Sequence, residues 1–104
     1  MTFNTLFLAH TPDADPEKHK CLIETSMYKF HAVLVKDQHQ ALEVSKKYVE
    51  EKDIHSILLC PGFTHKDIGE LSQAVGPNVS ICVARGDGPS GRVAAEAMKK
   101  AGWF

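Results

Sequence analysis

The sequence lacks an excess of charge of either sign. Its 12 Lys and Arg residues nearly balance its 13 Asp and Glu residues, which gives a formal net charge of -1. A chain without surplus basic residues has no patch to hold a phosphate backbone and no polybasic segment to bind anionic lipid. We therefore expect neither nucleic acid nor a membrane surface as a partner.

The N-terminal region lacks a long hydrophobic run. The segment Met1 to His10 contains no Lys or Arg, and its apolar run, Leu6 to Ala9, is too short for a signal-peptide core or a membrane span. These features predict a cytoplasmic protein.

Cysteine is scarce, and the histidines lack metal-binding spacing. Cys21, Cys60 and Cys82 are an odd number at wide intervals with no C-x-x-C pair, which indicates reduced thiols rather than a disulfide framework or zinc ribbon. The six histidines form no H-x-H, H-x-x-H or H-E-x-x-H pattern, so we predict no metal site. Only the folded chain could bring His10, Cys60 and His65 together as ligands.

What is present is an ordinary globular composition, with 43% hydrophobic and 24% charged residues in 104 residues. This length predicts a single domain spanning residues 1–104. Apolar and β-rich runs predict strands at 3–10, 28–35, 54–60 and 79–85. Between and after them, capping signals and apolar stripes predict helices from Asp15 to about Thr25, from Asp37 to about Lys52, from Thr64 to Gly76, and after Gly91.

Strands and helices in strict alternation indicate parallel strands joined by right-handed helical crossovers. The predicted fold class is therefore α/β. We expect a three-layer α/β/α sandwich with a four-stranded parallel sheet in the flavodoxin-like order 2-1-3-4. In such sheets ligands bind beyond the carboxyl ends of the strands, where the strand order reverses. His10 and the turn after Cys60 should meet there.

Cys60 follows an apolar strand and precedes the turn Pro61-Gly62-Phe63 and a helix start. A helix N-terminus lowers the pKa of a nearby thiol, so Cys60 with His65 is a candidate catalytic nucleophile and base. The alternative is that Cys60 packs as a small hydrophobic residue.

The segment Gly86-Asp87-Gly88-Pro89-Ser90-Gly91 matches G-x-G-x-x-G between a predicted strand and helix. It does not lie in the first βα turn, and the chain ends too soon to hold the acidic residue expected about 20 positions later, so a dinucleotide site is not predicted. An anion nest capped by Ser90, with Arg85 or Arg92 beside it, is one interpretation, and a plain turn-rich loop is the other.

Together these features predict a cleft for a small molecule, which could be an anion, at the carboxyl edge of the sheet. Its expected lining is His10, Asp13, Gly62, Phe63, Arg85, Gly86, Gly88, Ser90 and Gly91. No cofactor and no reaction are indicated. The alternative is a non-catalytic interaction or regulatory domain that forms a homodimer through its terminal aromatic residues, Trp103 and Phe104.

The helix start Ala14 to His19, the junction Val35-Lys36-Asp37 and the turn Cys60 to His65 give the chain a further resemblance. It resembles a family of short prokaryotic proteins classed as a domain of unknown function, from the N-terminus to about Arg85. The resemblance implies a compact α/β domain with a Cys-x-Gly-Phe turn and brings no activity with it.

Overall fold

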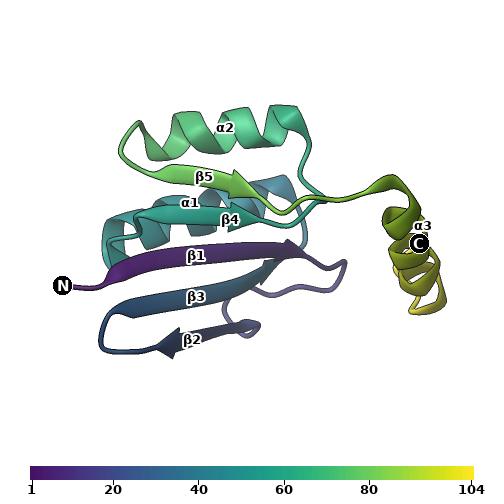
Figure 1. Cartoon of the computed structure of the whole chain (residues 1–104), viewed down its shortest axis with the longest axis horizontal. Coiled ribbons are helices and arrows are strands. Elements are labelled where there is room, and N and C mark those ends of the chain that lie inside the picture. The colour runs from purple at the N-terminus through teal and green to yellow at the C-terminus, as the bar shows by residue number, and fades with distance from the viewer.

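The computed structural model describes residues 1–104 and contains five strands and three helices (Figure 1). In chain order the elements are β1 (Phe3–His10), β2 (Lys20–Glu24), β3 (Tyr28–Val35), α1 (Gln38–Lys52), β4 (Ser56–Leu59), α2 (His65–Val75), β5 (Ser80–Val83) and α3 (Gly88–Lys100). None of the three helices combines the length and the apolar character that crossing a membrane requires.

The strands form one mixed sheet in the order β2-β3-β1-β4-β5. β1 pairs in parallel with β3 and with β4, and β5 pairs in parallel with β4. β2 is antiparallel to β3 and forms one edge of the sheet. The carboxyl ends of the four parallel strands therefore lie along one border of the sheet, where the loops after β1, β4 and β5 emerge.

The predicted fold class, a three-layer sandwich with a four-stranded parallel sheet in the order 2-1-3-4, is wrong. The sheet has five strands, and one neighbouring pair is antiparallel. The chain remains an α/β protein, but α1 and α2 pack together against the same face of the sheet, and α3 extends away from the body (Figure 1). No helix covers the other face.

The cause of this difference is the segment between Asp15 and Thr25, for which the sequence predicts a helix. The capping signal at Asp15 is used, because its side chain accepts a hydrogen bond from the Glu17 amide, but the turn ends at His19. The chain then continues as β2, a short apolar strand that completes its hydrogen bonds against β3. Pairing with an existing strand outweighs the weak propensity of a short isolated helix.

The hydrophobic core lies between the sheet and the pair α1 and α2. Alternate residues of the three central strands point into it, including Leu6, Leu8, Val33, Ile57 and Leu59, all at most 1% exposed. The remaining members are Val35, Ala41, Val44, Tyr48, Ile54, Phe63 and Leu71. Because successive side chains of a strand point to opposite faces, the residues between these core positions lie on the open face.

The other predicted elements are confirmed, with shorter limits for the last two strands. β4 and β5 contain only 56–59 and 80–83, and α3 begins at Gly88 rather than after Gly91. Thr64 and Asp67 form the predicted capping box at the start of α2, with reciprocal side-chain to backbone hydrogen bonds. Asp37 caps α1 by accepting a hydrogen bond from the Gln40 amide.

Candidate functional site

The carboxyl ends of β1 and β4 bring an imidazole and a thiol together. His10 is the last residue of β1, and Cys60 follows β4 directly. These strands are parallel neighbours with Leu8 opposite Leu59, and the Cys60 amide donates a hydrogen bond to the Leu8 carbonyl oxygen. The backbone that positions both side chains is therefore part of the sheet rather than a free loop.

The two side chains face each other. Cys60 Sγ lies 3.7 Å from His10 Nδ1, and either atom can donate the hydrogen bond, according to the tautomer of the imidazole. The His10 ring also stacks on Phe63, with ring centroids 4.1 Å apart and an interplanar angle of 29°. Phe63 itself is only 6% exposed. Packing against a buried ring restricts the orientation of the imidazole beside the thiol.

Gly62 allows this close arrangement. A Cβ atom at Gly62 would lie 2.9 Å from His10 Nδ1 and 3.6 Å from Cys60 Sγ. The first distance is shorter than any ordinary contact, so a larger residue would require His10 to move. The glycine in the Cys-Pro-Gly-Phe turn is therefore needed for space beside the imidazole.

The electrostatic surroundings of His10 favour its neutral form. Burial lowers the pKa of His10 below its ordinary value of about 6.5, and the nearby carboxylates of Asp67 and Asp37 oppose this effect only in part. Both carboxylates are already engaged as caps of α2 and α1. The N-termini of these two helices therefore have their own anionic partners, which reduces their attraction for an external anion.

The lowered pKa values of His10 and His31 predict that the protein loses stability as the pH falls from about 7.5 to about 5.5. For both groups the unfolded chain binds a proton more readily than the folded chain, so the unfolded state gains protons first. Stability is full above the ordinary pKa of about 6.5 and decreases as the pH falls toward the lower folded pKa values. Urea unfolding at several pH values measures this slope.

Substitution of His10 by Gln provides the control for this pH dependence. The variant removes one of the two histidines whose pKa is lowered by folding. Its free energy of unfolding should therefore change less between about pH 7.5 and 5.5 than that of the unsubstituted chain. An unchanged slope in the variant would contradict the assignment of a lowered pKa to His10.

His65, the predicted base, lies elsewhere. It is the first residue of α2, its side chain is exposed, and no hydrogen bond joins it to Cys60. The imidazole beside the thiol is that of His10, which the sequence predicts only as a ligand contact. Whether Cys60 and His65 act in catalysis stays a prediction, and the geometry gives the neighbouring position to His10.

The other predicted binding residues are only partly gathered at this edge. Gly86 approaches the turn after β4, because a Cβ there would lie 3.3 Å from Pro61 Cβ. Asp13 is exposed and accepts a hydrogen bond from Thr11, and Arg85 is exposed and paired with Asp87 at 2.9 Å.

The first turn of α3 contains the rest of the predicted anion nest. Gly88, Ser90 and Gly91 are exposed and lie within the helix. Asp87 occupies the N-cap position without making a side-chain hydrogen bond to the helix. Ser90 is therefore inside α3 and not at its cap, and the segment is a helix start rather than the loop that the sequence suggested.

His10 Nδ1 and Cys60 Sγ are also the donor types that soft metals prefer. No group of three or more His, Cys, Asp or Glu side chains is gathered anywhere in the structure with the geometry to hold a metal ion. The edge therefore offers two donors, and a complete metal site would need ligands from elsewhere.

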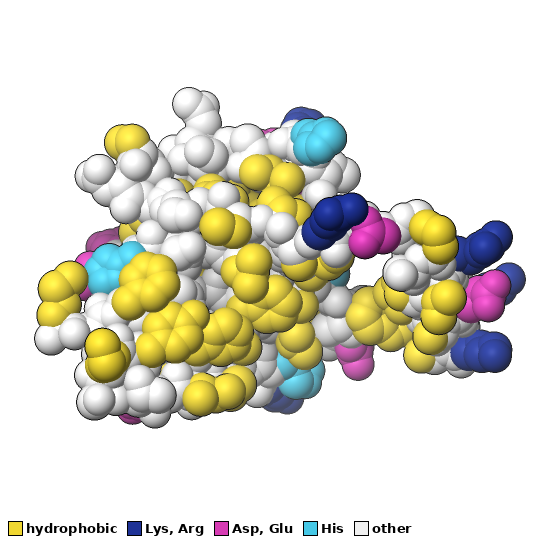
Figure 2. Space-filling model, in the orientation of Figure 1, with side chains coloured by type: hydrophobic (Ala, Val, Ile, Leu, Met, Phe, Trp, Pro, Cys, Tyr) yellow, Lys and Arg dark blue, Asp and Glu magenta, His cyan; other side chains and the backbone are white.

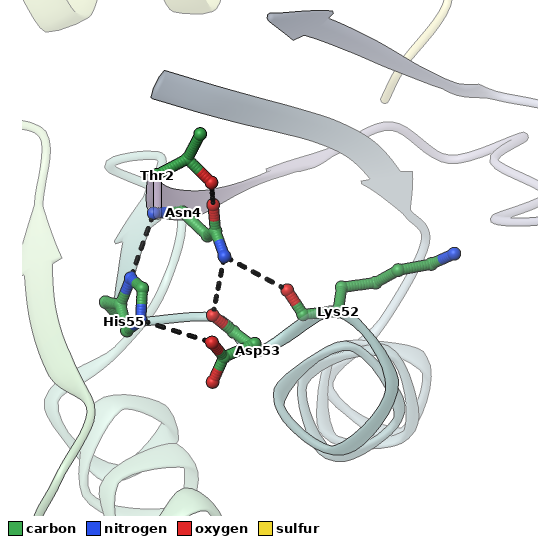
Figure 3. Close-up of polar contacts among 5 residues, drawn as sticks. All are labelled: Thr2, Asn4, Lys52, Asp53 and His55. Carbon is green, nitrogen blue, oxygen red and sulfur yellow. Dashed lines mark hydrogen bonds and ion pairs between the residues drawn. The ribbon is translucent and has the colours of Figure 1, made fainter. Parts of the chain in front are cut away.

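A polar network around Asn4 lies at the opposite end of the strands, and it was not predicted from the sequence (Figure 3). The Asn4 side chain, which is 6% exposed, donates hydrogen bonds to the carbonyl oxygens of Asp53 and Lys52, at 3.0 and 3.4 Å. The Asn4 amide donates to His55 Nδ1 at 3.0 Å. These contacts join the start of β1 to the end of α1. The one feature of the sequence that could have indicated this network is Asn4, a side-chain amide close to the apolar run of β1.

The same end of the sheet contains the hollow that is lined by Asn4, Lys29, His31 and Lys52, among others. His31 is 7% exposed, and its Nε2 atom is buried without a hydrogen-bond partner. Burial lowers the pKa of His31, and the nearby Lys52 and Lys29 lower it further. The hollow is open, and His10 and Cys60 do not line it.

Comparisons with curated proteins and with solved structures found no significant match. A comparison with protein-family models found a match over residues 3–99, which extends past Arg85 and includes the glycine-rich segment and most of α3. The resemblance to a family of unknown function is thus confirmed over nearly the whole chain. The protein belongs to the DUF6506 family, a family of unknown function.

Proposed function

We propose that the chain binds a small polar molecule at the carboxyl edge of the sheet, with His10 and Cys60 as its polar contacts. The observation that supports this is the approach of His10 Nδ1 to Cys60 Sγ, at 3.7 Å, beyond neighbouring parallel strands. Ligands of open α/β sheets bind at such strand ends. Phe63 holds the imidazole in place, and Gly62 leaves space beside it.

The surroundings favour an uncharged ligand over the anion that the sequence also suggested. The carboxylates of Asp37 and Asp67 face this edge and occupy the helix N-termini that would otherwise attract an anion. A neutral imidazole both donates and accepts hydrogen bonds, so it suits a neutral group with the same capacity, such as an amide or a hydroxyl. The ligand class we propose is therefore neutral and polar.

A reaction at this edge would begin at Cys60, with His10 placed to take the thiol proton. No third side chain is hydrogen-bonded to His10 Nε2 to orient the imidazole, as a complete triad would require. The geometry therefore supports binding more strongly than it supports catalysis.

The test screens neutral amides, polyols and nucleosides for protection of Cys60 against alkylation by iodoacetamide, read by peptide mass spectrometry. A compound that binds the edge slows the modification of Cys60 and leaves the rates of Cys21 and Cys82 unchanged, because those two thiols lie on the open face. If no compound slows the alkylation of Cys60 relative to that of Cys21 and Cys82, the proposed ligand class is wrong.

A Gly62→Val variant should lose the protection that such a compound gives. The new side chain displaces the His10 imidazole, since even a Cβ would lie 2.9 Å from Nδ1, and we expect affinity to fall about tenfold or more. The variant should still fold, because Gly62 is exposed and its backbone does not have a positive φ. Binding is measured by the same alkylation assay.

Gly69→Val is the matched control for this substitution. Gly69 lies in α2, and a Cβ added there would have no atom within 4 Å, so protection of Cys60 should be retained. The site would be refuted if both variants lost protection of Cys60 equally. It would also be refuted if Gly62→Val lost its thermal stability together with the protection, because the loss of binding would then follow from unfolding.

The second candidate function is that of an interaction or regulatory domain that forms a homodimer, with no ligand. The observation that favours it is the apolar surface left uncovered, which includes Phe104 at 73% exposed and the open face of the sheet. The expected cytoplasmic location, which rests on the composition, is compatible with both functions and belongs to the proposal.

A further inference from the structure

The open face of the sheet is mostly apolar, and none of the strand residues that point to it has a charged side chain. His55, which precedes β4, stacks on Phe3 at the border of this face, with ring centroids 5.9 Å apart. By the alternation along each strand, Phe3, Phe7, Phe30, Leu58 and Cys82 lie on the face opposite the core, which Figure 2 shows as a continuous hydrophobic area at the front of the sheet. The same face carries Thr5, Ala9, Cys21, Ile23, Tyr28, Ala32, Leu34, Ser56 and Ser80.

Aromatic contacts hold this face together without covering it. Phe3 stacks on Tyr28 at 5.7 Å between ring centroids, and Phe7 stacks on Phe30 at 6.2 Å. Phe3 remains 52% exposed and Ile23 63% exposed. The apolar residues of this face, exposed or half-buried, come from all five strands, and a contiguous apolar patch of that kind marks an interaction site.

The helix α3 has an exposed apolar side that matches the apolar character of the open face. Val93, Ala94, Ala97, Met98 and Ala101 form one apolar stripe, and α3 contains no buried residue. The charged residues Arg92, Glu96, Lys99 and Lys100 lie outside this stripe, and Figure 2 shows charged side chains gathered on the outer side of the helix. A helix with one apolar side normally packs that side against another element.

The chain before α3 directs the helix away from its own sheet. The Ala84 amide still donates to the Leu59 carbonyl oxygen, and Gly86 lies against Pro61. Only Asp87 remains between this point and the start of α3. The helix therefore begins beyond the sheet edge and projects outward (Figure 1), and the radius of gyration of 14.1 Å exceeds the roughly 13 Å of a compact chain of this length.

We propose that the chain forms a symmetric dimer in which the α3 of each copy packs its apolar stripe on the open sheet face of the other. The inference is independent of the ligand site at His10 and Cys60, and it identifies the surface for the dimeric alternative. Each copy supplies one helix and one face, so a two-fold axis satisfies both unpartnered surfaces at once.

The extent of the two surfaces suits a stable dimer. The helix is about 20 Å long and about 10 Å wide, and such a helix buries roughly 400 Å² of its own surface and about the same area of the sheet beneath it. Two exchanged helices therefore bury roughly 1,600 Å² in total, which is the usual size of a specific interface. The uncharged face and the apolar stripe contain no group that this burial would leave with an unpaired charge.

The first measurement is native mass spectrometry of the full, untagged chain, which should give the mass of two copies. A monomer at micromolar concentration would overturn the proposal. A dimer alone does not identify the surface, because two open faces could pack directly on each other or the terminal aromatic residues could make the contact.

Cross-linking between two differently marked chains identifies the surface. One chain keeps only Cys82, on the open face, with the other two cysteines changed to serine. The other chain has all three native cysteines changed to serine and carries Ala97→Cys on the apolar stripe of α3. The two chains are co-expressed and treated with a short bismaleimide, and helix exchange should give a mixed cross-linked dimer as the main product.

Lys99→Cys in place of Ala97→Cys is the control, because this position lies on the opposite side of α3 and should give at least about fivefold less mixed dimer. Equal yields from the two positions, or links only between two Cys82 chains, would refute helix exchange. A third chain with Cys82 and Ala97→Cys together tests folding back: a link within one chain in place of the dimer would also refute the proposal.

Discussion

An Asn4→Asp variant should lose about 3 kcal/mol in free energy of unfolding near pH 7. The Asn4 side chain is buried and donates its two hydrogen bonds to the carbonyl oxygens of Lys52 and Asp53 at the end of α1 (Figure 3). An ionised carboxylate of the same shape would have no proton to donate and would face two carbonyl oxygens instead. Urea unfolding monitored by circular dichroism measures the loss.

The pH dependence of this variant separates charge from shape. Burial and the two carbonyl oxygens raise the pKa of the new carboxyl group in the folded state above its ordinary value of about 3.9. The unfolded chain therefore holds the proton less well, and the penalty relative to the unsubstituted chain is full at neutral pH. It decreases as the pH falls through the raised folded pKa, when the carboxyl group becomes a donor again.

Asn4→Ala provides the companion variant, with an expected loss of about 2 kcal/mol that is independent of pH in the same range. It removes the two donors but adds no charge. If Asn4→Asp were as stable as the unsubstituted chain near pH 7, the hydrogen bonds from Asn4 to the end of α1 would not contribute to the fold.

A Phe63→Ala variant should lose about 3 kcal/mol in free energy of unfolding and should also change the titration of His10. Phe63 is a member of the hydrophobic core and stacks on the His10 ring. Its removal exposes the imidazole to water, so the pKa of His10 should rise toward its ordinary value. Urea unfolding measures the first effect, and NMR titration of the imidazole measures the second.

Phe63→Leu distinguishes packing from the local surroundings of His10. Leucine keeps most of the buried volume, so this variant should recover more than half of the stability that Phe63→Ala loses. His10 should still titrate below its ordinary pKa, because it remains partly covered. A normal His10 titration in the unsubstituted chain, or one unaffected by Phe63→Ala, would show that the contact with Phe63 does not set the pKa.

The candidate site shows what residue patterns can predict and what they cannot. The end of a buried strand, followed by Pro61-Gly62 and a capping box, indicated the place where His10, Gly62 and Phe63 now lie beside Cys60. The pattern did not indicate which histidine would face the thiol. His65 is closer to Cys60 in the sequence, but the pairing of β1 with β4 brings His10 to it from 50 positions away.

The sequence by itself determined the local elements whose signals are complete within a few residues. The capped helices α1 and α2 and the apolar strands β1, β3 and β4 belong to this group, because caps and periodic side chains act over one or two turns. The positions of the three helices relative to the sheet did not follow from such signals.

Only the tertiary structure decided that the segment after His19 is a strand, since its hydrogen bonds are completed by β3 rather than by its own backbone. That single pairing replaces the helix that would have covered the second face of the sheet and leaves that face open, while the short connection after β5 directs α3 away from it. Hydrogen bonds between distant segments decide such questions, and local propensity is too weak to compete with them.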